Sequence, residues 1–72
     1  MFGNYENISN TELSQIIDEW ITGRRAERNR DIMKRRLIDG ICFEPLAEEF
    51  DLSVRQIKRI VYQCEYTIFR HI

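Results

Sequence analysis

The chain has 72 residues, of which 43 % are hydrophobic and 32 % are charged, and its formal net charge is -1. This composition is too apolar for a disordered tail and too charged for a membrane protein, so it predicts one compact domain with a thin margin of stability. No apolar run is long enough for a transmembrane helix, and no signal peptide is recognisable at the N-terminus. We therefore expect a cytoplasmic protein with no membrane partner.

The cysteines and the histidine form no recognisable disulfide or metal-binding pattern. Cys42 and Cys64 lie far apart and His71 stands beside the C-terminus, so we expect free, buried or half-buried thiols, no metal and no cofactor. The chain has no Gly-rich phosphate loop and no evident nucleophile–base pair. Adjacent acids such as Glu48 and Glu49 point in different directions on a helix. These features predict that the protein is not an enzyme.

Charge alternates along the chain in blocks. Residues 1–22 carry four acidic and no basic residues, and residues 23–36 carry seven basic and two acidic ones. Residues 37–51 then carry five acidic and no basic residues, and residues 52–72 carry four basic and one acidic. A polyanion responds to the local field rather than to the net charge, so a nucleic-acid partner is compatible with this sequence.

The first predicted element follows a flexible N-terminus over residues 1–7. Over residues 8–23, apolar residues recur at the spacing of one helix face: Leu13, Ile16, Ile17, Trp20 and Ile21. Ser9 with Glu12 predicts a capping box at its start, and Gly23 predicts a left-handed residue that ends it.

A second helix, strongly basic on its outer surface, is predicted within residues 24–40. Its inner side is expected to carry Ala26, Ile32, Met33 and Leu37, and Gly40 is expected to end it. The basic residues are interpreted either as a flank that binds phosphate or as a solvated helix surface, and the sequence does not separate the two. The candidates for phosphate contact are Arg24, Arg28, Lys34 and Arg35.

A short third helix is predicted from about residue 43 to residue 50, with Leu46, Ala47 and Phe50 buried. Cys42 is expected at its N-cap, where sulfur is a poor hydrogen-bond acceptor. The stretch D-L-S at residues 51–53 predicts a tight corner. Asp51 tolerates a left-handed conformation, and Ser53 with Gln56 three residues later forms a second capping box.

The fourth helix, about residues 54–70, has two distinct faces. The inner face is expected to consist of Ile57, Ile60, Val61, Cys64 and Ile68, and the outer face of Arg55, Arg59, Tyr62, Tyr66 and Arg70. A short helix, a tight turn and a longer basic helix are typical of a helix-turn-helix, whose second helix enters the DNA major groove. Arg can fork onto guanine, Gln can pair with adenine and Lys can neutralise phosphate.

The stretch RLIDGICFEPLAEEFDLSVRQIKRIVYQCEYTIF, residues 36–69, resembles the region 4 helix-turn-helix of RNA polymerase sigma-70 factors. The family pattern reads approximately R-Y-x-E-G-L-S-Y-E-E-I-A-E-x-L-G-V-S, and response regulators and small phage or prophage regulators share much of it. In the family, residues just after the turn read promoter DNA. This resemblance implies that Val54, Arg55, Gln56, Lys58 and Arg59 do so here.

The chain departs from the family pattern in three respects. Val54 stands where many sigma factors have a polar or basic residue, and Cys42 and Pro45 replace the usual Ser and Glu. The sequence also lacks a segment long enough to melt DNA and clamp the polymerase. The resemblance therefore implies a module like sigma region 4 rather than a whole sigma factor.

Together these features predict an all-α protein with one helical DNA-binding domain of four helices over residues 8–72, its helix-turn-helix at about 43–70. The expected function is sequence-specific regulation of transcription, of phage or prophage type, with double-stranded DNA as partner. The DNA-binding candidates are Ser53, Val54, Arg55, Gln56, Lys58, Arg59 and Tyr62. The alternatives are a module that docks on RNA polymerase or another regulator, and a component of phage DNA packaging. We also expect a homodimer, at least on DNA, paired through Tyr66, Phe69 and Ile72.

Overall fold

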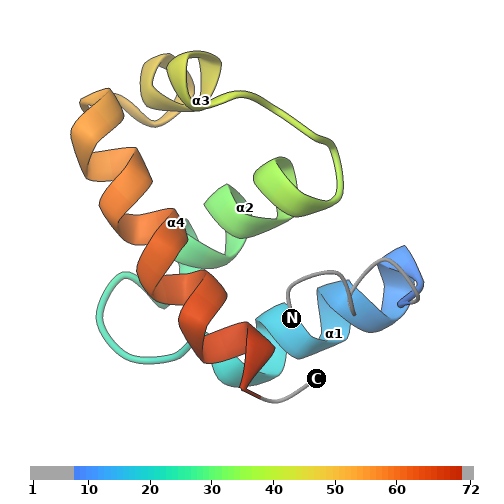
Figure 1. The fold of residues 1–72 in the computed structure, drawn as a ribbon. Coiled ribbons are helices and arrows are strands. Elements are labelled where there is room, and N and C mark those ends of the chain that lie inside the picture. Colours follow the sequence, from blue (N-terminus) through green and yellow to red (C-terminus); the bar gives the residue numbers. More distant parts are fainter. Residues whose placement is uncertain (1–7, 71–72) are drawn as a thin grey trace.

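The computed structural model describes residues 8–70, which form four α-helices and no strand (Figure 1). These are α1 (Asn10–Trp20), α2 (Ala26–Leu37), α3 (Phe43–Phe50) and α4 (Val54–Phe69). The prediction of an all-α chain with four helices is confirmed for this part of the chain. The expected flexible segment 1–7, His71 and Ile72 lie outside the described residues. None of the four helices has the length and apolar character needed to cross a membrane.

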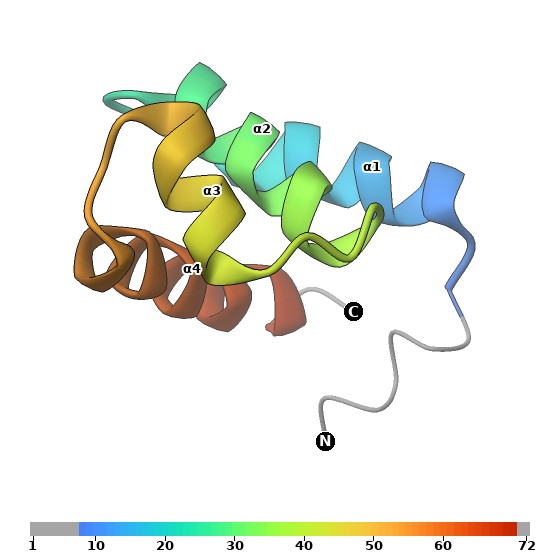
Figure 2. The same ribbon diagram turned by 90° about the horizontal axis from the view of Figure 1, so that it is seen from above.

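Helices α2 and α4 form the centre of the molecule. Both pack against α1 and α3 as well as against each other. In Figures 1 and 2, α4 crosses in front of α1 and α2, and α3 lies beside the first turns of α4. The corner between α3 and α4 therefore lies at the end of the molecule where α4 begins.

Every helix contributes to a single hydrophobic core. The buried residues are Leu13, Ile17, Ile21, Ile32, Met33, Leu46, Ala47, Ile57, Val61, Cys64 and Ile68. Five residues expected on inner faces are only half-buried, because they lie at the rim of this small core: Ile16, Ala26, Leu37, Phe50 and Ile60. Trp20, expected on the apolar face of the first helix, is exposed. The prediction that both thiols are buried or half-buried is wrong for Cys42, which is exposed.

The start of α1 follows the prediction, whereas its end does not. The Glu12 amide donates to Ser9 Oγ at 3.1 Å and the Ser9 amide to Glu12 Oε1 at 3.3 Å, which is a capping box. The helix ends at Trp20, and Ile21 is extended with φ -91°. Its buried side chain directs the chain into the core before Gly23 is reached. Gly23, at φ +90°, forms the next turn and accepts the Ala26 amide at 3.3 Å.

The corner between α3 and α4 follows the prediction closely. Asp51 is left-handed, with φ 56° and ψ 46°, and the Leu52 and Asp51 amides donate back to the carbonyls of Ala47 and Glu48 at 2.9 and 3.4 Å. These are the two hydrogen bonds of a Schellman motif. Ser53 then begins α4 with a capping box that includes Gln56. Backbone hydrogen bonds at the end of α3 and side-chain hydrogen bonds at the start of α4 therefore both fix the position of the first turn of α4.

Candidate nucleic-acid interface

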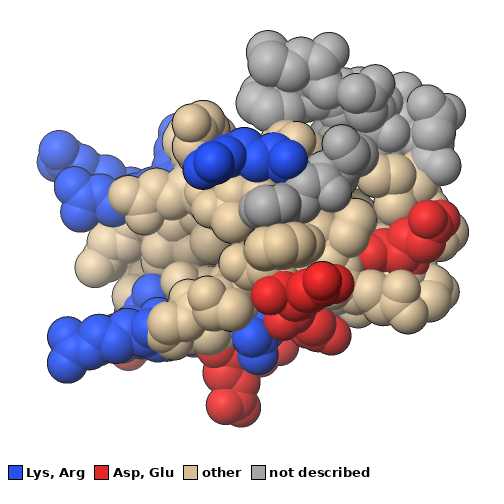
Figure 3. All heavy atoms as spheres, turned by 90° about the horizontal axis from the view of Figure 1, so that it is seen from below, with Lys and Arg blue, Asp and Glu red and all other residues tan. Residues whose placement is uncertain are grey.

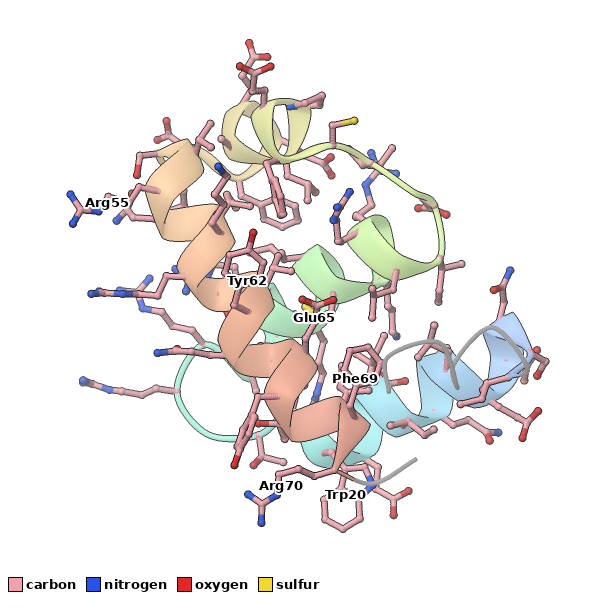
Figure 4. All side chains as sticks on the ribbon, viewed as in Figure 1. Trp20, Arg55, Tyr62, Glu65, Phe69 and Arg70 are labelled. Carbon is pink, nitrogen blue, oxygen red and sulfur yellow. The ribbon has the colours of Figure 1, made fainter. Side chains whose placement is uncertain are left out.

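The first turns of α4 present basic side chains to solvent. Arg55, Lys58 and Arg59 are all exposed, and none of them has an ion-pair partner among residues 8–70. Arg55, Gln56 and Arg59 line a hollow of about 170 Å³. Figure 4 shows the Arg55 side chain extending away from the body of the molecule. Unpaired guanidinium groups on an exposed helix face can donate hydrogen bonds to anions or to base edges.

Helix α2 contributes a further arginine beside this face. Arg28 lines an adjoining hollow together with Leu52, Gln56, Arg59 and Ile60. Its Nε and Nη2 donate to the amide oxygen of Asn29 at 3.2 and 3.1 Å. Because this partner is neutral, the charge of Arg28 is oriented but not cancelled.

The loop between α1 and α2 carries two more exposed arginines, Arg24 and Arg25. Arg25 is left-handed, with φ 57°, and caps α2 without a side-chain hydrogen bond. Arg30 Nε donates to the Ile21 carbonyl at 2.7 Å, which ties α2 to the beginning of this loop. The sequence places Arg25 among the basic residues that could flank phosphate, but it does not single Arg25 out as a contact candidate.

Two basic residues near the C-terminal end of α2, Lys34 and Arg35, form ion pairs. Lys34 Nζ lies 2.8 Å from Asp18 Oδ1 of α1. Arg35 lies 2.8 Å from Glu49 of α3 and 3.2 Å from Asp39, and the hydrogen bond and charge of Glu49 together with those of Asp39 raise the pKa of Arg35. Phosphate contacts from Lys34 and Arg35 stay a prediction, and each residue would have to exchange a carboxylate partner for a phosphate to make one. Among the basic residues from 24 to 36, Lys34 and Arg35 are thus paired with carboxylates, whereas Arg24, Arg25 and Arg28 have no ion pair within residues 8–70.

Positive and negative side chains are separated on the surface. In the face shown in Figure 3, the projecting Lys and Arg side chains lie mainly at the left end, whereas the Asp and Glu side chains lie in the lower middle and at the right, among uncharged residues. Figure 1 places the start of α4 and the loop between α1 and α2 at that left end. A net charge of -1 thus coexists with a strongly positive end, which we call the basic edge and define as Arg24, Arg25, Arg28, Arg55 and Arg59.

Phe43 organises the flank of α4 that faces α3. The Lys58 Nζ atom lies 5.7 Å from the centroid of its ring, and the Arg36 guanidinium lies 4.4 Å from it. The Tyr62 ring meets it edge-on, with centroids 6.1 Å apart. Burial raises the pKa of nearby Glu65, while the positive charge of Arg36 opposes the shift. Lys58 and Tyr62 are thus placed by an aromatic side chain that sequence reasoning counted only as the start of a helix.

Two DNA-binding candidates are engaged in capping α4. The Ser53 amide donates to Gln56 Oε1 at 2.9 Å, and the Gln56 amide donates to Ser53 Oγ at 3.1 Å. Val54, the remaining candidate, is half-buried and lines a hollow with Cys42, Phe43, Glu44 and Lys58. Six of the seven candidates therefore lie at the N-cap and in the first two turns of α4, and Tyr62 lies further along the helix, but they differ in which atoms remain free.

The second half of α4 carries exposed aromatic side chains. Tyr62 and Tyr66 are 56 % and 66 % exposed, and the Arg70 guanidinium lies 5.6 Å from the centre of the Tyr66 ring. Phe69 is half-buried. On another side of α4, Trp20, Ile21, Thr22, Asn29, Gln63, Cys64 and Thr67 line a hollow of about 330 Å³. Burial raises the pKa of the Cys64 thiol, with the charge of Arg28 opposing the shift.

No protein-family model, curated protein or solved structure matches this chain.

Proposed function

We propose that this chain is a sequence-specific DNA-binding regulator of transcription. In this proposal α3 and α4 form a helix-turn-helix like that of sigma region 4, and α4 enters the major groove. The observation that carries the proposal is the basic edge. Its five arginines come from a loop and two helices, and none of them is paired with a carboxylate among residues 8–70.

The proposal assigns different tasks to the two parts of the basic edge. Arg55 and Arg59 lie one turn apart on the exposed side of α4, near its start, where groove-facing side chains reach base edges. Arg24, Arg25 and Arg28 lie on other elements and supply positive charge to the phosphates beside the groove. Helices α2 and α4 pack directly against each other, so the side chains on the two helices are held in a fixed relation before binding and less ordering is required when DNA binds.

The local field also supports this proposal. Most of the acidic side chains lie elsewhere or are already paired with Lys34 and Arg35. A phosphate backbone approaching the basic edge therefore meets more arginines than carboxylates, the adjoining acidic residues being Glu27 and Asp51. Repulsion by the acidic part would disfavour other orientations, so the charge separation would set the direction of approach.

The test is selection of bound duplexes from fragmented genomic DNA, followed by affinities for the recovered site and for random duplex. We expect one motif to be enriched. Arg55→Ala and Arg59→Ala should each cost on the order of 1–3 kcal/mol on the recovered site and much less on random DNA. If both variants bind the recovered site as tightly as the parent, α4 is not the reading element.

The alternative function is docking on RNA polymerase or another regulator. The exposure of Tyr62 and Tyr66 favours it, because tyrosines are enriched at protein interfaces. The two functions are separated by a gel shift with mixed genomic fragments, run beside a pull-down with purified polymerase. Binding to polymerase by a protein that leaves every fragment unshifted would favour the alternative.

A further inference from the structure

The capping bond of Gln56 restricts what this side chain can read. The Ser53 backbone amide is a donor, so the Gln56 atom 2.9 Å from it must be the oxygen, Oε1. Pairing with adenine in the major groove requires an amide oxygen to accept from N6 and an amide nitrogen to donate to N7. The cap uses one of the two lone pairs of Oε1 and holds this oxygen toward the Ser53 backbone, so the group of the Gln56 amide without a bond is its NH₂, which only donates.

The other polar side chains in the first turns of α4 are donors as well. Arg55, Lys58 and Arg59 carry no acceptor atom. Ser53 Oγ already accepts the Gln56 amide, which leaves its O–H as a donor. From residue 53 to residue 59, the exposed side chains therefore offer mainly hydrogen-bond donors, and the acceptors that remain are the second lone pairs of Gln56 Oε1 and Ser53 Oγ.

We propose that α4 selects guanine in the major groove. The inference rests on the proposed function and deepens it by naming the base that is read. Guanine presents two adjacent acceptors, O6 and N7, whereas adenine and cytosine each present an amino donor and thymine presents one acceptor beside a methyl group. A surface of donors satisfies both groups of guanine, and it leaves the amino groups of adenine and cytosine without a partner.

Acceptors do occur near this surface, and their positions limit what they contribute. Tyr62 has a hydroxyl that can accept, but its ring packs edge-on against Phe43. Gln63 lies in the wall of the hollow that contains Trp20. Glu44 shares a hollow with Val54 and Lys58, where its carboxylate could meet a cytosine amino group. That contact would also select a G·C pair, but it would not depend on the guanine N7 atom.

The experiment uses the full chain and a library of random duplexes. The recovered site is resynthesised with 7-deazaguanine or 7-deazaadenine, which lack the N7 acceptor, at one position at a time. We expect guanines in the motif, and a loss of about tenfold or more for 7-deazaguanine at one of them at least. A motif without guanine, or a larger loss for 7-deazaadenine, would overturn guanine selection and leave DNA binding intact. Failure of the parent to bind any duplex would overturn both proposals.

Two variants with matched controls test the role of individual side chains. Gln56→Glu keeps an oxygen for the cap, as Glu12 does in α1, so the melting temperature should be unchanged while the preference for the selected site over random duplex falls. Gln63→Glu makes the same change of charge on the same helix and should keep that preference. Arg59→Lys keeps the positive charge but removes the bidentate hydrogen-bond donors of the guanidinium. It should therefore lower affinity for the selected site about tenfold and affinity for random duplex by less than about twofold. Equal behaviour of Gln56→Glu and Gln63→Glu would show that the Gln56 amide does not read DNA.

Discussion

Arg28 and Lys34 lie six residues apart on α2 but have different electrostatic surroundings. Arg28 donates to the neutral amide of Asn29 and lies beside Gln56 and Arg59 of α4. Lys34 is paired with Asp18, with Nζ and Oδ1 2.8 Å apart, beside the ion-paired Arg35. If the basic edge holds phosphates, replacing each residue by alanine should have very different consequences for DNA binding.

The size of the difference follows from counterion release. One phosphate contact contributes about 0.9 to the slope of log K against log salt, which at 0.1 M salt is worth about eightfold, or about 1.2 kcal/mol, relative to 1 M. Arg28→Ala should therefore weaken binding to every duplex about eightfold at 0.1 M and reduce the salt slope by about one. Lys34→Ala removes a charge that Asp18 already balances, so it should change affinity by less than about twofold.

The assay is fluorescence anisotropy with labelled specific and random duplexes at several salt concentrations between about 0.05 and 0.3 M, over which the Debye length falls and is about 10 Å at 0.1 M. Thermal melting of both variants provides the control, because an exposed ion pair contributes only about 0–1 kcal/mol to stability. Equal losses of affinity and of salt slope for Arg28→Ala and Lys34→Ala would refute the distinction between the unpaired Arg28 and the ion-paired Lys34.

Three further predictions concern stability and assembly. Cys42 occupies the N-cap position of α3 without a side-chain hydrogen bond. Cys42→Ser should therefore stabilise the fold by up to about 1 kcal/mol, measured by thermal unfolding. A lower melting temperature would show that the thiol makes contacts that a hydroxyl cannot replace. Because burial raises the pKa of Glu65, the folded state binds this proton more tightly than the unfolded state, and stability should fall as pH rises from the ordinary carboxyl pKa through the raised one. Glu65→Gln should flatten that part of a curve of melting temperature against pH, and an unchanged curve would contradict the assignment. We also expect a dimer on DNA, which sedimentation of the protein with and without the recovered site would test; a monomer in both would argue against it.

The corner between α3 and α4 could be predicted from sequence because its signals are local. A residue that tolerates the left-handed conformation, Asp51, precedes a capping serine, and Gln56 completes the box three residues later. Gly23 gave an equally clear local signal and was wrong as the end of α1. There the burial of Ile21 takes the chain out of the helix first, and that burial depends on helices that are distant in sequence.

The candidate interface could be predicted only in part for the same reason. Helical periodicity places Arg55 and Arg59 on the exposed side of α4, as the structure has them. The sequence could not show that Asp18 and Glu49 neutralise Lys34 and Arg35, because these partners come from other helices. For Gln56, the sequence indicated both a capping role and a reading role. Only the hydrogen-bond geometry shows that the two compete for one oxygen atom.

The hollow beside the loop between α1 and α2 contains the single tryptophan of the chain, Trp20, at 39 % exposure. In Figure 4 it lies at the lower end of the molecule, close to Arg70. An indole at the end of α1 senses both the packing of that helix and the polarity of the loop that follows it. Its intrinsic emission therefore provides a native optical reporter, with which unfolding and occupation of the arginine-bearing loop can be followed in unlabelled protein.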